Sequence, residues 1–265
     1  MAILKNSVVF FFTFFFSAIA YAAHPLITDD TGTQGKGKFQ IEINSQFLTD
    51  KEQTDGLSVQ ETGGEAGVAL SYGIADNVDL VVGMPLKWYT FKEGCMTVAD
   101  ESGIGDMGIE LKWRLFESEE SGMSLALKPG LSIPTGNELK GLGNGALSAG
   151  LTLISTHEGR LGALHCNLGY SSNAFGIKEN NETARNDIWH ASLAAELNMT
   201  DSIRSVANIG VESNEDKTSD IHPVFLIAGL IWSVHENLDI DLGLKCGLNK
   251  AETDTTFLAG LAARF

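Results

Sequence analysis

Side chains that could do chemistry recur at every second position in several stretches of the chain. Asp239 and Asp241 alternate with Leu238, Ile240 and Leu242. A period of two places the acids on one face of a β-strand and the apolar residues on the other. Carboxylates, amines and imidazoles on one surface can bind polar solutes or pair with one another, so we predict that they line a polar lumen. The predicted lumen residues are Glu42, Asp79, Glu110, Lys112, Arg114, Lys128, His190, Arg204, Asp239, Asp241, Lys245 and Arg264.

Oxygen-rich stretches raise the question of a metal site. Glu179–Glu182, and Asn214-Glu215-Asp216 with Asp220, offer the oxygen ligands that Ca²⁺ prefers. They lack a rigid ligand spacing, and Thr28-Asp29-Asp30 is more typical of a turn than of a cation site. We therefore predict no metal and no cofactor.

Twelve stretches with the two-residue period must position these side chains. The connections between them alternate between short turns and longer segments rich in Gly, Asn, Asp, Glu and Lys, the longer ones near 49–60, 92–104, 134–144, 172–185, 214–221 and 249–254. The predicted strands cover about 38–48, 63–74, 77–90, 105–116, 122–133, 145–156, 160–171, 186–198, 202–213, 222–234, 238–248 and 255–265.

This pattern is typical of a bacterial outer-membrane barrel. Membrane strands need only about 9–11 residues each, and such barrels have short periplasmic turns and longer extracellular loops. We predict an all-β fold, a transmembrane antiparallel up-and-down β-barrel of about twelve strands. The alternative is a soluble β-sandwich or lipocalin-like barrel, whose apolar face would point inward.

Three regions are predicted along the chain. Lys5, the apolar run 8–19 and Ala20-Tyr21-Ala22 have the layout of a secretory signal peptide with its cleavage site. The formal net charge of −16 argues against a nucleic-acid partner. We predict a signal peptide over 1–22, a polar leader over 23–37 that is either periplasmic or a lumen plug, and the barrel over 38–265.

Two features of the predicted strands leave room for interpretation. If the last two strands form a hairpin, Asp239 lies opposite Arg264, and a hairpin at 117–121 sets Glu110 opposite Lys128. The stretch 222–234 is apolar on both faces, so one apolar set faces inward. That set either contacts a hydrophobic solute or packs against a folded-in segment such as the leader. The two sets are Phe225, Ile227 and Ile231, and Val224, Leu226, Leu230 and Trp232.

One pair of residues has the spacing of a catalytic site. His190 and Ser192 lie on one face of a strand, where a histidine could activate a serine for attack on an ester. A family of outer-membrane phospholipases uses this spacing, but on the lipid side. Here the pair shares the polar face with Glu196. We predict a hydrogen-bonding pair and no enzyme, with a lipid-modifying hydrolase as the third alternative.

Three stretches resemble a known family. Residues 24–42, Gly105 to Trp113 and Pro129 to Gly136 are similar to a family of bacterial outer-membrane barrels associated with the meta-pathway of phenol degradation and described as transporters. The resemblance implies a barrel fold and uptake linked to aromatic catabolism, and it assigns no catalytic or substrate-contacting residue. Phe265 resembles the terminal aromatic that closes such barrels and that their assembly machinery reads, so we expect Phe265 to pair with Phe39.

The predicted function is passive passage of small solutes, hydrophobic or aromatic ones among them, through the outer membrane of a Gram-negative bacterium. A closed structural or adhesive barrel without transport is the alternative. The predicted partners are membrane lipid, the barrel assembly machinery and a small-molecule solute. The solute, the width of the lumen, the oligomeric state and the redox state of Cys95, Cys166 and Cys246 do not follow from the sequence.

Overall fold

The fold consists almost entirely of antiparallel strands. The computed structural model describes residues 24–54 and 57–265, and the predicted signal peptide lies outside them. The strands are β1 (Phe39–Thr54), β2 (Leu57–Ala75), β3 (Val78–Glu93), β4 (Met96–Ile104), β5 (Met107–Ser118), β6 (Met123–Ile133), β7 (Ser148–Gly159), β8 (Gly162–Ser172), β9 (Asp187–Asn198), β10 (Ile203–Glu212), β11 (Val224–His235), β12 (Leu238–Gly247) and β13 (Thr255–Arg264). The short helices are η1 (Glu138–Lys140) and α1 (Lys178–Thr183).

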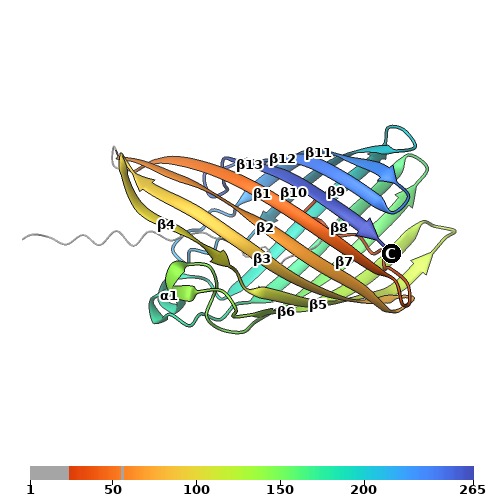
Figure 1. The fold of residues 1–265 in the computed structure, drawn as a ribbon, viewed down its shortest axis with the longest axis horizontal. Helices are drawn as coiled ribbons and strands as arrows, with labels where there is room; N and C mark the ends of the chain where they lie inside the picture. Colours follow the sequence, from red (N-terminus) through yellow and green to blue (C-terminus); the bar gives the residue numbers. More distant parts are fainter. Residues whose placement is uncertain (1–23, 55–56) are drawn as a thin grey trace, which may run out of the picture.

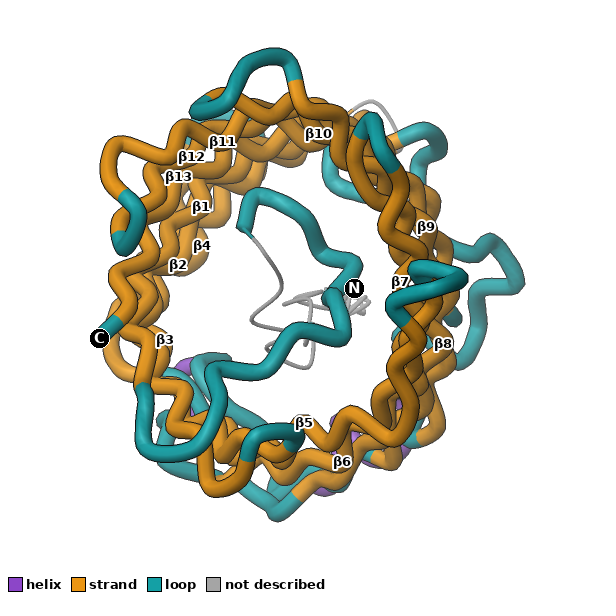
Figure 2. Tube along the Cα trace, turned by 90° about the vertical axis from the view of Figure 1, so that its right-hand side faces the viewer, coloured by secondary structure: helices purple, strands orange, loops and turns teal. Residues whose placement is uncertain are grey.

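The strands close into a ring (Figures 1 and 2). Apart from β4 and β5, which both pair with β3, each strand pairs with its neighbour in sequence, and β13 returns to pair with β1. The C-terminal half of β3, from Leu86 on, pairs with β4, and the N-terminal half, up to Gly83, pairs with β5. β4 and β5 therefore form one wall strand, which is interrupted at Gly105 and Asp106. The described residues therefore form the predicted twelve-stranded barrel.

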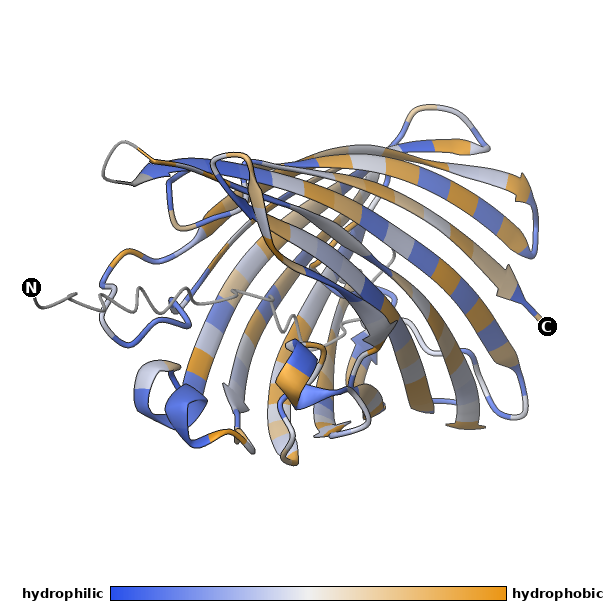
Figure 3. Ribbon diagram, turned by 60° about the vertical axis from the view of Figure 1, so that its left-hand side comes forward, coloured by the Kyte–Doolittle hydropathy of each residue, from blue (hydrophilic) through white to orange (hydrophobic). Residues whose placement is uncertain are grey.

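The apolar face of the barrel points outward. Along the strands, hydrophilic and hydrophobic residues alternate (Figure 3). The side chain of Leu242 is 65% exposed on the outside, whereas Asp79 on the opposite parity is 1% exposed. A soluble barrel would bury the leucine and expose the aspartate, because apolar surface is driven out of water. The outward apolar face is that of a membrane barrel.

Polar extensions of β1 to β4 correct the predicted loops. Segments 49–60 and 92–104 were expected to be loops, yet β1 runs to Thr54, β2 starts at Leu57, and β3 and β4 form a hairpin around 94–95. Backbone pairing continues there from Thr49 opposite Thr62 to Thr54 opposite Leu57. Loss of apolar alternation marks where these strands leave the membrane, and the backbone hydrogen bonds continue beyond that point.

Two predicted cross-strand pairs are wrong in register by two residues. Asp239 lies opposite Ala262, and Glu110 lies opposite Gly130. Side chains at diagonal positions of a sheet are within reach of one another when they are long. Arg264 Nη2 therefore still lies 2.9 Å from Asp239 Oδ2, and Lys128 Nζ lies 3.4 Å from Glu110 Oε2. The ion pairs form across the diagonal.

Two further facts complete the description of the fold. Within residues 24–54 and 57–265, no helix is long and apolar enough to cross a membrane. Cys95, Cys166 and Cys246 are all free thiols.

The seam between β1 and β13 is closed by Phe39 and Phe265. The two residues exchange backbone hydrogen bonds of 3.2 and 2.9 Å, and their rings stack with centroids 4.9 Å apart. Deleting Phe265 removes both bonds and the stacked pair, about 2–4 kcal/mol together. We expect a lower yield of folded barrel, measured as the fraction that runs at folded mobility in unheated gel samples.

Arg264→Ala is the matched control for this deletion. Asp239 keeps Arg204 Nη2 at 3.2 Å when the Arg264 guanidinium is removed. Half-exposed ion pairs contribute at most about 1 kcal/mol, so the folded yield should stay close to that of the unmodified chain. An equal loss in both variants would mean that the seam does not depend on the contacts of Phe265.

Candidate functional site

The leader, residues 24–37, lies inside the ring of strands (Figure 2). Its composition is polar, yet Leu26, Thr28, Asp29 and Thr31 are all buried. A polar segment can be buried only if its donors and acceptors find partners. The barrel wall supplies these partners, and they come from strands all round the ring.

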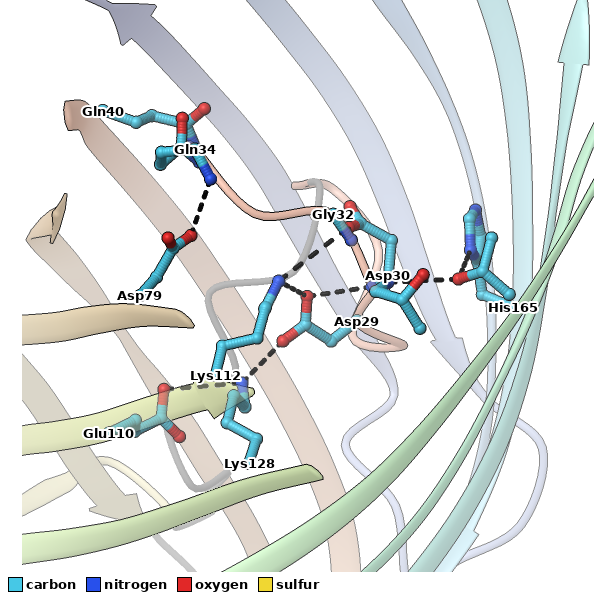
Figure 4. Close-up of polar contacts among 12 residues, drawn as sticks. Asp29, Asp30, Gly32, Gln34, Gln40, Asp79, Glu110, Lys112, Lys128 and His165 are labelled. Carbon is cyan, nitrogen blue, oxygen red and sulfur yellow. Dashed lines mark hydrogen bonds and ion pairs between the residues drawn. The ribbon is translucent and has the colours of Figure 1, made fainter. Parts of the chain in front are cut away.

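Asp29 is the centre of a buried ion cluster (Figure 4). Its carboxylate oxygens lie 2.8 Å from Lys112 Nζ on β5 and 2.7 Å from Lys128 Nζ on β6. Lys128 Nζ also faces Glu110. Burial alone would raise the pKa of Asp29, but the two ammonium groups hold this pKa below its ordinary value. The leader is thus attached by a fully charged carboxylate.

Sequence reasoning missed this role of Asp29. The turn interpretation holds for its neighbour, since Asp30 accepts a hydrogen bond from the backbone N–H of Gly32. Asp29 instead joins the leader to two strands about 80 to 100 positions further along the chain. No local signal pointed to this role, because Lys112 and Lys128 each have an inward acid beside them on the wall, Asp79 and Glu110 respectively.

Asn208 on β10 holds the leader backbone. Its side-chain oxygen accepts from the N–H groups of Ile27 and Thr28 at 2.8 and 3.1 Å, and its amide donates to Thr28 Oγ1 at 2.6 Å. Thr28 Oγ1 in turn donates to Ser192 Oγ at 2.8 Å. His190 and Ser192 both lie on the inner face, and the serine hydroxyl is bonded to the leader.

The leader also has apolar contacts. Leu26 belongs to a buried cluster with Ile231, and Ile27 packs against the cluster that contains Phe225 and Ile227. These contacts decide between the two interpretations of strand β11: the inward apolar set packs against the folded-in leader. Phe225 in addition reaches a cavity described below.

Other predicted lumen residues also contact the leader. Asp241 Oδ1 lies 2.5 Å from His24 Nδ1, and Asp79 Oδ2 accepts from the backbone N–H of Gln34 at 2.9 Å. Together with Lys112 and Lys128, they place four of the predicted residues in direct contact with the leader.

The remaining predicted lumen residues pair with the wall or its loops. Arg204 lies 2.8 Å from Glu196 and shares Asp239 with Arg264. The His190 ring packs against the inner wall over Gly169. Three other predicted lumen residues, Glu42, Lys245 and Arg114, have partners nearby in the wall or loops. Glu42 accepts from Gln40 and Asn44, Lys245 pairs with Glu252 at 2.9 Å, and Arg114 pairs with Glu117 at 3.3 Å.

Among the cavities in the described part of the chain, two lie on opposite sides of the leader. The periplasmic chamber, about 570 Å³, is lined by charged and polar side chains that include Asp30, Asp239 and Arg264, with Phe39 and Phe265 at its edge. The outer chamber is narrower, about 90 Å³, and more apolar. The residues that define it are Ile27, Gly130, Gly150, Ile188, His190 and Phe225.

Loop 134–147 folds inward at the outer mouth and is tied down by Asp106. The two carboxylate oxygens of Asp106 accept from the backbone N–H groups of Gly136 and Asn144, both at 2.8 Å. The inward hydroxyl of Tyr89 donates to Lys140 O at 2.9 Å. Asp106 also lines the outer chamber. Sequence reasoning assigned Asp106 no role, although it lies in a motif that carried the family resemblance.

The part of the chain that the structure describes contains no group of three or more His, Cys, Asp or Glu residues that could hold a metal ion. The chemistry available to the site is therefore that of hydrogen bonds, ion pairs and apolar contact.

Solved structures share this fold. An outer membrane channel from Pseudomonas putida F1 matches with a TM-score of 0.67 and 14% identity, over 89% of this chain and 98% of that one. The NanC porin matches with a TM-score of 0.55 and 6% identity, over 84% and 98%. The translocator domain of the autotransporter NalP from Neisseria meningitidis matches at 0.54 and 12%, over 87% and 89%.

The similarity to these three structures is one of fold, and no curated protein matches the chain in sequence. A closed barrel with an apolar outer face, similar to these outer-membrane proteins, is located in the outer membrane of a Gram-negative bacterium. A family model described as "Putative MetA-pathway of phenol degradation" matches residues 23–265, so the chain belongs to that family of outer-membrane barrels.

Proposed function

We propose that the protein is a passive channel for small solutes, hydrophobic and aromatic ones among them, and that the leader is the plug of its closed state. The observation that carries this proposal is the leader itself. It crosses the lumen as a segment without regular secondary structure, held by side-chain contacts and hydrogen bonds, with a chamber on each side. Movement of the leader would join the two chambers into one route.

The size of the barrel supports this proposal. Eight-stranded barrels are filled by their own side chains, whereas sixteen-stranded porins leave an aqueous channel. A twelve-stranded barrel lies between these limits. Inward residues of the wall fill part of the lumen, and the leader crosses the remaining space with a chamber on each side. Its displacement would leave a passage lined by the mixed charges listed above.

The channel from Pseudomonas putida F1 and the family description bear on the solute. The first is a channel with the same fold, and the second associates the family with phenol degradation. Aromatic solutes of low molecular mass are therefore the first to test. We propose the barrel assembly machinery as the partner that inserts the chain, and we propose no catalytic residue.

Permeation can be measured on purified protein in proteoliposomes and planar bilayers. The full chain and a variant that lacks residues 24–31 are compared for ionic conductance and for uptake of labelled phenol and glucose. We expect low, transient conductance from the full chain and a larger, steady conductance from the variant, with phenol entering faster than glucose. A correctly folded variant that conducts no ions and admits neither solute would overturn the channel proposal.

A closed structural or adhesive barrel is the second candidate. The observation that favours it is the polar extension of β1 to β4 beyond the membrane, where continued backbone pairing presents a surface of paired strands to the exterior. It predicts no permeation from either form, together with loss of cell adhesion when 50–61 and 90–101 are shortened. The same conductance measurement therefore separates the two candidates.

A further inference from the structure

The inner wall of the outer chamber contains two adjacent glycines. One row of paired residues crosses it from β5 to β9: Glu110 lies opposite Gly130, Gly130 opposite Gly150, Gly150 opposite Ser171, and Ser171 opposite Ile188. Inward side chains would otherwise fill this surface. The Glu110 side chain lies over Gly130, since a Cβ built there would stand 3.1 Å from Glu110 Cγ. A Cβ built at Gly150 would meet its nearest neighbour at 3.5 Å, an ordinary contact distance. The space over Gly150 is therefore available to an occupant.

A second row runs beside the first. Lys128 lies opposite Thr152, Thr152 opposite Gly169, Gly169 opposite His190, and His190 opposite Glu212. The His190 ring lies directly over Gly169, since a Cβ there would stand only 2.0 Å from His190 Cε1. The absence of a side chain at Gly169 lets the imidazole lie flat against the wall. The chamber thus keeps a smooth surface beside the two glycines.

The remaining walls combine apolar side chains with polar residues, which include Asp106, Ser192 and Glu212. Phe225 packs over Gly210 in the same way, and Ile27 of the leader and Ile188 of β9 face the same space. Three large apolar side chains around a flat backbone floor form a slot that suits a planar ring, because a ring can contact the floor on one face and the side chains on the other. At about 90 Å³ the slot has room for one small ring only.

One end of the slot is polar and incompletely satisfied. The side chains of Glu110 and Lys128 both line the chamber and are 9% and 3% exposed. Lys128 Nζ lies 2.7 Å from Asp29 Oδ2 and 3.4 Å from Glu110 Oε2. Among the described residues, no hydrogen bond of good geometry reaches Glu110 Oε2. A buried polar atom of this kind costs free energy until a partner arrives. A hydroxyl is a fitting partner, because it can donate to this carboxylate oxygen.

We propose that the outer chamber is a binding site for a small ring-shaped solute that carries one neutral hydroxyl group. The ring lies over Gly150 between Ile27, Ile188 and Phe225, and the hydroxyl donates to Glu110. A hydrocarbon ring leaves the buried oxygen of Glu110 without a donor, and a carboxylate is repelled by Glu110. This inference rests on the proposed channel function, for which the site is the first station on the outer side of the leader.

Binding can be tested separately from permeation. Saturation-transfer NMR on the purified full chain in lipid nanodiscs, with empty nanodiscs as the blank, uses phenol, toluene and benzoate as probes. We expect phenol to give the strongest protein-dependent signal. Gly150→Leu fills the slot and should reduce the phenol signal at least tenfold, and Gly150→Val serves if the leucine variant does not fold. Ala228→Leu, at an exposed outward position of β11 that does not line the chamber, is the matched control and should leave the signal unchanged.

The outcomes distinguish the site from the channel. An undiminished phenol signal in folded Gly150→Leu or Gly150→Val overturns the site, whether or not the protein conducts. If toluene gives as strong a signal as phenol, the role of the hydroxyl is overturned. If benzoate gives a stronger signal than phenol, the solute class is overturned. If phenol binds and Gly150→Leu abolishes that binding, the site stands even when proteoliposomes show no permeation, and only the channel proposal fails.

Discussion

Asp29→Ala should open the barrel. The substitution leaves Lys112 and Lys128 without the carboxylate that joins them to the leader. Removing one partner of a buried ion pair costs about 3 kcal/mol or more. At about 1.4 kcal/mol per tenfold, the ratio of docked to undocked leader should fall roughly 100-fold. Single-channel recording in planar bilayers should show this change as a large rise in open probability.

The neighbouring Asp30 provides the control. Its carboxylate is about one-third exposed and lies 3.8 Å from Lys112 Nζ, a longer and more solvated contact than those of Asp29. Asp30→Ala removes the same charge from the adjacent position and should change open probability only a few-fold, since exposed pairs contribute at most about 1 kcal/mol. If the two variants open to the same extent, the charge of the leader matters and the buried cluster does not.

The sign of the pH dependence follows from the lowered pKa of Asp29. A carboxyl group whose pKa is lower in the docked state stabilises that state above its ordinary pKa and loses this contribution as pH falls through the lowered value. The contribution of Asp29 should thus be constant around neutral pH and decline only in strong acid. Asp29→Ala should remove the part of any acid-induced opening that this group causes.

Asp106→Ala should release loop 134–147 from the outer mouth. Asp106 accepts two backbone hydrogen bonds, from Gly136 and Asn144, and each bond to a charged acceptor contributes about 1.5–3 kcal/mol. Their loss should raise the open population of the loop by at least roughly 100-fold. Trypsin cleavage after Lys140, which tracks that population, should accelerate accordingly in intact outer-membrane vesicles.

Asp100→Ala is the matched control for this prediction. Asp100 lies on β4 at the same outer end, and its carboxylate accepts one hydrogen bond, from Thr90 Oγ1 at 3.2 Å. Removing it changes the surface charge equally but leaves the loop attached, so cleavage after Lys140 should keep its rate. Slow cleavage in Asp106→Ala would show that Tyr89 and the Lys140–Glu101 ion pair hold the loop without it.

The barrel itself followed from local pattern. Alternation such as Leu238 to Leu242 assigns each side chain to one face, because successive residues of a strand point in opposite directions. In a membrane barrel this alternation shows which side chains face the lipid and which face the lumen. Strand number, faces and the ion pairs Asp239–Arg264 and Glu110–Lys128 could therefore be predicted, although the register was two residues off because turn geometry and diagonal reach were not visible in the pattern.

The path of the leader was decided only by the tertiary structure. Nothing local to Thr28-Asp29-Asp30 distinguishes a solvated turn from a buried anchor, since its partners Lys112, Lys128 and Asn208 lie 80 to 180 positions away. Those partners come together only when the barrel closes around the segment. The sequence by itself determined a membrane barrel with a polar interior. Closure of the ring decided which of those polar groups hold the leader and which remain available to a solute.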